Sequence, residues 1–184
     1  MQIYQKAHDW LFVQAVDSGV RNCLFIRSTL EDPNELSFAI FENLSTTKQA
    51  QSRHIMRLLP VLGSCKCEDA KISELALDLF TKHLKGVTQF TYALEVKVRA
   101  NTDANKSHIF NSVNRSLSEL KPLATVGLSN PDYFIAVNVI KRVCMISILK
   151  SFIKFRKYNV QEVTTTTTEV ENDDENKSTT EDVQ

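Results

Sequence analysis

Hydrophobic and polar residues alternate in several short segments of the chain, a pattern that predicts β-strands. The clearest case is Phe90 to Ala100, where every second residue is apolar and Glu95, Lys97 and Arg99 occupy the other face. A period of two with one polar face is typical of a half-buried strand. Strands are also predicted over 22–28, 52–61, 133–140 and 143–149. Segment 133–140 is apolar on both faces, so we expect it to be a central strand.

Two other segments have apolar residues at every third or fourth position, which predicts amphipathic helices. These segments are 69–85, with Gly86 at the position of a C-cap, and 106–120. A third helix is predicted to begin at Asp32-Pro33, because Asp is a favourable N-cap and Pro suits the first helical position. A short helix is expected near Ala7–Val16, where the pattern is ambiguous.

From residue 22 onward, the predicted elements follow one another in the order β-α-β-α-β-α-β-β. This order predicts an α/β (mixed α+β) fold. We expect a mixed sheet covered by helices. The 184 residues suffice for one medium domain, or for a domain with a small additional lobe. From Thr164 to Gln184 the sequence has almost no apolar residues, so we expect a disordered tail.

The formal net charge of zero conceals a strong asymmetry along the chain. Residues 160–184 contain eight acidic residues and one basic residue, which gives this tail a charge of −7 and residues 1–159 a charge of +7. Such an asymmetry favours an anionic partner for the basic body. Simple solvation of charged faces explains the charge equally well.

The basic residues of the body are grouped on predicted strands and at their junctions. Arg53 and Arg57 are four positions apart on one predicted strand, and therefore on one face. Cationic side chains on a rigid sheet are suited to salt-sensitive contacts with RNA phosphates. The candidate RNA-binding residues are Arg53, Arg57, Lys97, Arg99, Lys141, Arg142, Lys154, Arg156 and Lys157.

Three aromatic residues, Phe152, Phe155 and Tyr158, are interspersed with basic residues near the end of the body. They could stack on unpaired bases, or they could belong to the core. We favour the core, because a stacking platform requires exposed rings.

The sequence has no pattern typical of catalysis, a cofactor or a metal. Its four glycines, at 19, 63, 86 and 127, are too far apart for a glycine-rich phosphate loop. Cys65 and Cys67 lack the second cysteine pair of a structural zinc site. His83 is interpreted as a structural histidine, and the spacing does not support Ser64-Cys65 with His54 as nucleophile and base. We therefore expect no catalytic residue, no metal and no cofactor.

Nothing in the sequence predicts export or a membrane span. The N-terminus lacks the pattern of a signal peptide, and the longest apolar region, 133–149, is interrupted by Asn138, Lys141 and Arg142. Free cysteines suit a reducing compartment. We expect a soluble intracellular protein.

Four segments resemble those of a known family: SRHIMRLLPVLGSCK (52–66), VKVRANTDANKSHIFNSV (96–113), LSNPDYFIAVNVIKRVCMISI (128–148) and FRKYNVQEV (155–163). The family is that of the THUMP-domain proteins that assist tRNA cytidine N4-acetylation. The resemblance covers about residues 11–163. Its most specific parts are Arg57–Pro60 and FRKYNVQEV, and a generic THUMP domain would share only the first.

The resemblance implies a non-catalytic adaptor that binds tRNA, with serine and leucine tRNAs expected, and presents it to a separate RNA cytidine acetyltransferase. It implies a partial ferredoxin-like lobe over 1–51, a THUMP domain over 52–160 and the acidic tail over 161–184. The first strand and helix of that lobe have no counterpart here. Six candidate residues match basic positions of the family: Arg57, Lys97, Arg99, Lys141, Arg156 and Lys157.

Two alternatives to the adaptor remain open at this stage. Other THUMP proteins are RNA-modifying enzymes, although they contain an additional catalytic domain. The chain could also be a protein-interaction module without RNA binding, with its acidic tail contacting a basic partner or its own basic face. Membership of the adaptor family implies a nuclear location, expected in the nucleolus, with the cytoplasm as the alternative.

Overall fold

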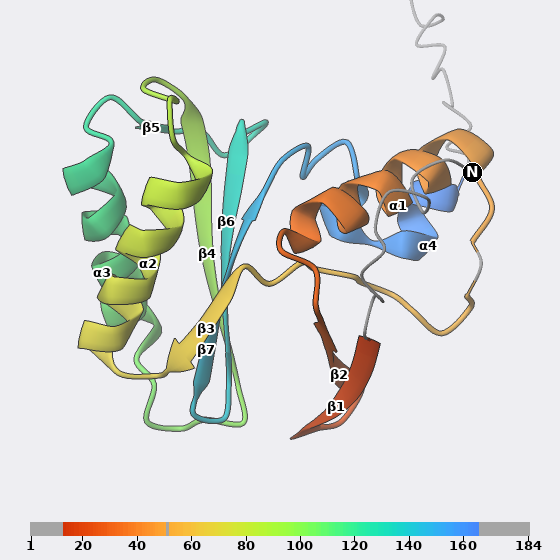
Figure 1. Cartoon of the computed structure of the whole chain (residues 1–184), viewed down its shortest axis with the longest axis horizontal. Coiled ribbons are helices and arrows are strands. Elements are labelled where there is room, and N and C mark those ends of the chain that lie inside the picture. Colours follow the sequence, from red (N-terminus) through yellow and green to blue (C-terminus); the bar gives the residue numbers. More distant parts are fainter. Residues whose placement is uncertain (1–12, 51, 166–184) are drawn as a thin grey trace, which may run out of the picture.

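The computed structural model describes residues 13–50 and 52–165. Within them a five-stranded mixed sheet, in the order β3-β7-β6-β4-β5, lies between two helical layers, and a separate hairpin pairs β1 with β2 (Figure 1). The elements are β1 (Val13–Val20), β2 (Cys23–Ser28), α1 (Pro33–Thr47), β3 (Gly63–Lys66), α2 (Asp69–His83), β4 (Thr91–Arg99), α3 (Lys106–Leu120), β5 (Thr125–Val126), β6 (Tyr133–Ile140), β7 (Val143–Leu149), the 3-10 helix η2 (Arg156–Tyr158) and α4 (Val160–Thr164). The predicted α/β class with a mixed sheet covered by helices is confirmed.

The central strands are the two that the apolar runs predict. β6 pairs antiparallel with β7 on one side and parallel with β4 on the other, in an unbroken register from Tyr92↔Tyr133 to Arg99↔Ile140. β6 therefore has a strand on each side, and its residues that face α2 and α3 (Tyr133, Ile135, Val137 and Val139) are buried. The predicted bounds of β6 and β7 agree with the structure.

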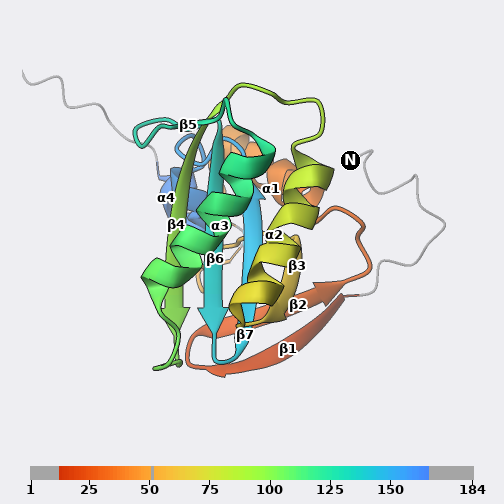
Figure 2. The same ribbon diagram turned by 90° about the vertical axis from the view of Figure 1, so that its left-hand side faces the viewer.

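Helices α2 and α3 lie side by side over one face of the sheet (Figure 2). Their apolar stripes include Ile72 and Phe80 on α2 and Val113 on α3, all with 0% exposure, and they pack on Ile135 and Ile146 of the sheet. A hydrogen bond of 2.6 Å between the hydroxyls of Ser73 and Ser112 joins the two helices. The two helices stabilise the fold mainly by burying their apolar stripes against the sheet, since apolar burial contributes about 25 cal/mol per Å².

The opposite face of the sheet is covered at one end by α1, η2 and α4 (Figure 1). Phe41 and Leu44 of α1 form a second core with Phe155, Tyr158 and Val163. Asp32 caps α1 by accepting a hydrogen bond of 2.8 Å from the Asn34 amide, as the Asp32-Pro33 pair predicts. The second core therefore joins residues from both ends of the described chain.

The hairpin β1–β2 leaves apolar residues exposed. Val13, Leu24 and Ile26 are 55%, 63% and 49% exposed. The helix expected near Ala7–Val16 is wrong over 13–16, because these residues pair with β2, from Val13↔Ser28 to Val16↔Phe25. Residues 7–12 of that prediction lie outside the described residues.

The predicted strand over 52–61 is also wrong. Between 52 and 61 the backbone forms only an isolated antiparallel bridge, Arg57↔Asn159, and the edge strand begins later, at Gly63. Leu58 and Leu59 pack on the second core instead of alternating across a sheet. The argument that placed Arg53 and Arg57 on one strand face therefore fails.

The end of the body extends further than the sequence predicts. Residues 161–164 were expected in the tail, but they belong to α4, and Val163 is 3% exposed within the second core. Asn159 caps α4 by accepting hydrogen bonds from the amides of Gln161 and Glu162. No helix among the residues that the structure describes is both long and apolar enough to cross a membrane.

Candidate nucleic-acid interface

The nine predicted RNA-binding residues lie in two separate groups. Five belong to segments that run beside the C-terminal end of the body, and we call these the C-terminal basic cluster: Arg53, Arg57, Lys154, Arg156 and Lys157. Four lie at the far end of strands β4 and β6, and we call these the turn cluster: Lys97, Arg99, Lys141 and Arg142. The β6–β7 turn is at the bottom of Figure 1, whereas η2 and α4 lie at its upper right.

Main-chain pairing brings the two halves of the C-terminal basic cluster together. Besides the Arg57↔Asn159 bridge, the Leu58 amide donates to the Tyr158 carbonyl at 3.2 Å, and the Val160 amide donates to the Met56 carbonyl at 2.9 Å. The Gln161 amide side chain donates to the Ser52 carbonyl at 2.7 Å, beside Arg53. Basic residues about a hundred positions apart in the sequence are therefore neighbours.

The backbone around η2 is left-handed over three consecutive residues. Arg156, Lys157 and Tyr158 have φ values of 48°, 59° and 57°. Each such residue costs about 1–2 kcal/mol relative to the right-handed conformation. Burial of Phe155 (0% exposed) and Tyr158 (2%) offsets this cost, as does a hydrogen bond of 3.0 Å from the Tyr158 hydroxyl to the Lys150 carbonyl. The side chains of Arg156 and Lys157 lie on the surface between these two buried rings.

The three aromatic residues are buried, as the preferred interpretation predicts. Phe152 stacks on Phe134 with ring centroids 3.6 Å apart, and Phe155 contacts Phe41 and Tyr158 at 5.5 Å. Their function is to hold the basic turn on the second core. They are not placed to stack on bases.

Lys154 lies beside an acidic residue and an aromatic ring. Its ammonium is 2.6 Å from Glu42 Oε1 and 5.4 Å from the centroid of Phe155. Both side chains of the ion pair are partly exposed, so the pair contributes at most about 1 kcal/mol. Lys154 can therefore leave its ion pair with Glu42 and bind a phosphate at little cost in free energy.

The sequence missed one basic residue of this region. Lys48 ends α1 in a left-handed conformation, and its ammonium donates to the Val163 carbonyl at 3.2 Å, 115 positions away. Lys48, Lys154 and Arg156 line one hollow of about 340 Å³. Nothing in the local sequence pattern indicates this contact, because it depends on how α4 packs on α1.

The turn cluster is built around the β6–β7 turn. The Lys141 amide donates to the Arg99 carbonyl at 3.0 Å, and the Asn101 side chain donates to the Lys141 carbonyl at 2.6 Å. Lys97 is half-buried and pairs with Glu95 at 2.7 Å. The tip of the β1–β2 hairpin, at Gly19, lies against the Lys141 side chain. Arg99, Lys141 and Arg142 are exposed, so this group also presents cations at the surface.

Lys66 is a second basic residue that the sequence missed. It is exposed, and β3 pairs it with Val143, the residue after Arg142. The Cys67 amide donates to the Arg142 carbonyl at 2.8 Å, which fixes this end of β3 against the turn cluster. The register of the edge strand, which the sequence does not reveal, brings Lys66 to this position.

The cysteines form an unexpected pair. Cys65 on β3 lies directly opposite Cys144 on β7, and all four cysteines are free thiols. Burial, together with the neighbouring Cys65 and Cys67, raises the pKa of Cys144 to about 12. Burial also raises the pKa of Cys65 and Cys67. These thiols are protonated near neutral pH and are therefore poor nucleophiles.

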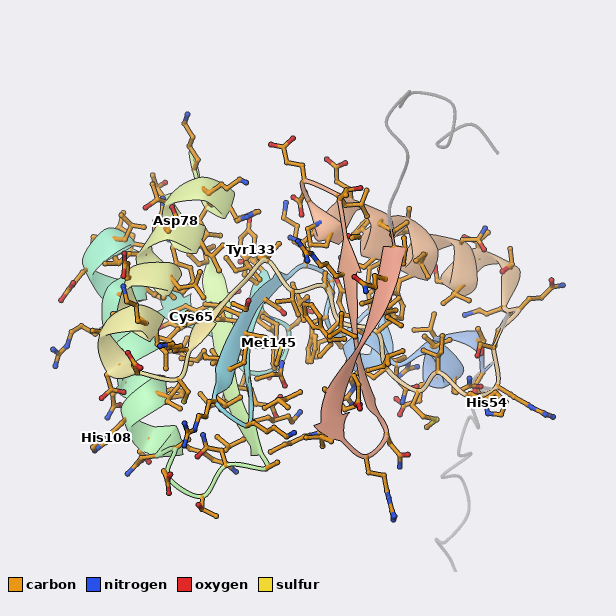
Figure 3. All side chains as sticks on the ribbon, turned by 60° about the horizontal axis from the view of Figure 1, so that its bottom comes forward. His54, Cys65, Asp78, His108, Tyr133 and Met145 are labelled. Carbon is orange, nitrogen blue, oxygen red and sulfur yellow. The ribbon has the colours of Figure 1, made fainter. Side chains whose placement is uncertain are left out.

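Two histidines of the described part of the chain, His54 and His83, were considered as functional residues from the sequence. Figure 3 shows His54 and Cys65 at distant parts of the molecule, so the pairing that the sequence did not support is not present in the structure. His83 is largely buried, with Nδ1 3.8 Å from Asp32 Oδ2, in keeping with the structural interpretation. Over residues 13–50 and 52–165, no group of three or more His, Cys, Asp or Glu side chains could hold a metal ion.

Comparisons with known proteins agree with this architecture. Residues 68–149 match the family model of the THUMP domain. "THUMP domain-containing protein 1" of Mus musculus is 33% identical over 150 residues, which cover 82% of this chain and 43% of that protein. The Drosophila melanogaster "THUMP domain-containing protein 1 homolog" is 30% identical over 151 residues, or 82% of this chain and 46% of that protein.

One solved structure shares the fold at low sequence identity. The crystal structure of PH1313 from Pyrococcus horikoshii Ot3 has a TM-score of 0.50 and 16% identity, and covers 77% of this chain and 43% of that chain. Residues 68–149 thus form a THUMP domain. The chain belongs to the THUMP domain-containing proteins, and it spans less than half the length of the relatives described above.

The two basic clusters differ in their relation to the matched domain. The turn cluster lies inside residues 68–149, whereas the whole C-terminal basic cluster lies outside them. The C-terminal basic cluster therefore lies on segments outside the matched residues, beside the second core that α1 helps to form.

Proposed function

We propose that this protein binds RNA, and specifically tRNA, through the C-terminal basic cluster. The main observation in support is the left-handed turn, which exposes Arg156 and Lys157 beside Arg57 on a rigid aromatic base. A conformation that costs free energy and holds two cations at the surface is typical of functional sites. Phosphate contacts by such cations supply most of the affinity for nucleic acid.

The turn cluster is the second part of the proposed interface. Arg99, Lys141 and Arg142 are exposed, and they extend the basic surface to the other end of the sheet. RNA helices are recognised largely by shape and backbone, so two separated basic groups on a rigid body suit this form of recognition. We expect the C-terminal basic cluster to dominate, because it contains five of the nine candidate cations and the turn cluster includes a half-buried lysine, Lys97, that is paired with Glu95.

The more specific part of the proposal is the adaptor role. The protein presents serine and leucine tRNAs to a separate RNA cytidine acetyltransferase, which performs the N4-acetylation, and it contributes no catalytic residue itself. Support comes from the resemblance over residues 11–163, above all in FRKYNVQEV, which forms the left-handed turn and α4. On this view β1, β2 and α1 belong to a partial ferredoxin-like lobe, and the protein acts in the nucleus.

RNA binding is tested by titrating serine tRNA with the full chain across a range of salt concentrations. For a protein that neutralises Z phosphates, the logarithm of the binding constant falls with the logarithm of salt with a slope of about −0.7Z to −0.9Z. We expect Z of about 4–6, given the cations in the two clusters. Binding that does not depend on salt, or no binding, would contradict the proposal.

The adaptor role is tested by reconstitution. Serine tRNA, acetyl-CoA and a purified RNA cytidine acetyltransferase are incubated with and without this protein, and N4-acetylcytidine is measured by mass spectrometry of the nucleosides. We expect acetylation to require both proteins. Acetylation by this protein alone would establish the enzyme alternative, and acetylation independent of this protein would remove the adaptor role.

A further inference from the structure

The C-terminal end of the body has a basic hollow of about 340 Å³ between α1, η2 and α4. Lys48, Lys154 and Arg156 supply three cations to its wall, and Glu162 supplies one carboxylate. This hollow adjoins the C-terminal basic cluster and shares Lys154 and Arg156 with it. We call it the basic pocket.

The acidic residues near the basic pocket are already engaged with other groups. Glu162 Oε1 accepts a hydrogen bond of 2.6 Å from the Asn159 side chain, and Glu42 pairs with Lys154 from outside the pocket wall. Lys48 donates to a main-chain carbonyl, which has no net charge. The pocket wall therefore has more positive than negative charge, and further carboxylates would be attracted to it.

The chain itself delivers carboxylates to this position. Thr165, the last residue that the structure describes, lines the basic pocket. Residues 166–184 follow, with seven acidic residues and one basic residue. Glu169 is four residues beyond Thr165, so it lies at most about 14 Å from it, and all the later acids are tethered to the same point.

We propose that the acidic segment 166–184 docks on the basic pocket and the adjoining C-terminal basic cluster of its own chain. Tethering places the acids near the cations at an effective concentration in the range of millimolar, so several acids can pair with the cations at once without recruiting a second molecule. Each exposed ion pair contributes little, but several together form an appreciable contact. The segment is an internal competitor for anionic ligands.

Docking of segment 166–184 on the basic pocket does not depend on the proposed function. Competition between this segment and RNA does rest on the proposed function. Phosphates and carboxylates compete for the same cations, so RNA must displace the acidic segment. Only ligands that offer several phosphates together, as tRNA does, displace it efficiently. The segment thereby weakens binding of short or isolated anions more than binding of tRNA.

The contact is tested without RNA by carbodiimide cross-linking of the full chain, which joins a lysine to a carboxylate only when the two touch. At low salt we expect links from residues 166–184 to Lys48 and Lys154, and their loss at high salt. Lys82 and Lys85, exposed at the end of the α2 layer, are the internal controls. Replacing the seven acids by their amides (E169Q, E171Q, D173N, D174N, E175Q, E181Q, D182N) should abolish the links.

Three results would overturn the contact: no links to Lys48 or Lys154, equal yields at Lys82 and Lys85, or links between isotopically distinct copies in a mixed sample. The competition has its own measurement, the affinity for serine tRNA of the full chain and of the seven-amide variant. We expect about tenfold tighter binding by the variant at low salt. Equal affinities would overturn the competition, and absence of tRNA binding by both would contradict the proposed function and leave the cross-linking result intact.

Discussion

Arg57 and Asn159 face one another across an isolated antiparallel bridge, which joins the segment before β3 to the end of the left-handed turn. Asn159 is 7% exposed and also caps α4, where its side-chain oxygen accepts from the amides of Gln161 and Glu162. Asn159 therefore lies opposite Arg57 and, through its side chain, orients the helix that follows Arg156 and Lys157. The geometry of the C-terminal basic cluster depends on it.

Replacing Asn159 by Ala should affect both stability and RNA binding. Loss of the cap and of the hydrogen bond to Glu162 should lower the free energy of unfolding by about 1–3 kcal/mol, measured by urea denaturation. Affinity for tRNA should fall about threefold, because the cations are less well positioned.

Asn105→Ala is the matched control, since Asn105 caps α3 by accepting from the amides of Ser107 and His108. It should lower stability by about 1 kcal/mol and leave tRNA affinity unchanged. A similar loss of affinity in both variants would show that general destabilisation is the cause.

At Lys157, the effect of the left-handed backbone on stability can be separated from the effect of the positive charge on tRNA binding. At a φ of 59°, glycine is favoured over a residue with a Cβ by about 1 kcal/mol. Lys157→Gly should therefore keep or raise the free energy of unfolding by up to about 1 kcal/mol while it weakens tRNA binding. Lys157→Val removes the same charge but should destabilise the protein, because a β-branched residue fits this conformation poorly. If Lys157→Gly lowered the stability as much as Lys157→Val, the left-handed geometry would be wrong.

Stability should fall under alkaline conditions. Burial raises the pKa of Tyr158 to about 12, and the pKa of Cys144 is raised to about 12 by the causes given above. In the unfolded chain these groups lose their protons at lower pH, the thiol near its ordinary value of 9.0 and the phenol near 10.0. The stabilisation is complete below pH 9 and is lost as the pH rises towards 12. Each group should contribute a fall of about 1.4 kcal/mol per pH unit in its own interval.

Urea denaturation in the presence of a reductant, at intervals between pH 8 and pH 11, measures this loss. Tyr158→Phe removes the phenol, so the fall above pH 10 should be shallower in the variant than in the natural protein. The same slope in both proteins would contradict the assignment to Tyr158.

Local patterns in the sequence predicted the layers of the fold. Strict alternation predicted β4, and the runs without charge predicted β6 and β7. The spacing of three and four predicted α2 and α3, and Asp32-Pro33 predicted the start of α1. Each of these elements buries a whole face or stripe, so the spacing of apolar residues in its own sequence indicates which side packs on the core.

The elements that failed depend on distant contacts. Segment 52–61 is apolar enough for a strand, but its partners are η2 and α4, a hundred residues later, and it makes only one bridge with them. The strand at 13–20 was missed because Val13 and Val16 fit a helical spacing equally well, and only pairing with β2 decides between the two. Helix α4 was missed because it has only five residues, Val160–Thr164, which are too few to show a helical period.

The nine candidate residues stay a prediction. Eight of them are exposed, as a binding role requires, but the sequence could not show that they form two groups. It also missed Lys48 and Lys66, whose positions depend on the packing of α1 and on the register of β3.

The central claim is that the C-terminal basic cluster binds tRNA, and a pair of double variants tests it most directly. Arg156→Ala/Lys157→Ala removes two cations from the cluster, and Lys82→Ala/Lys85→Ala removes two exposed cations from the α2 side of the molecule. Affinity for serine tRNA is measured for both variants and the natural protein across salt concentrations. We predict that the first variant binds roughly tenfold or more weakly at about 0.1 M salt and that its salt slope is smaller by about 2, while the second variant behaves as the natural protein does. Equal losses in the two variants, or none in the first, would contradict the claim.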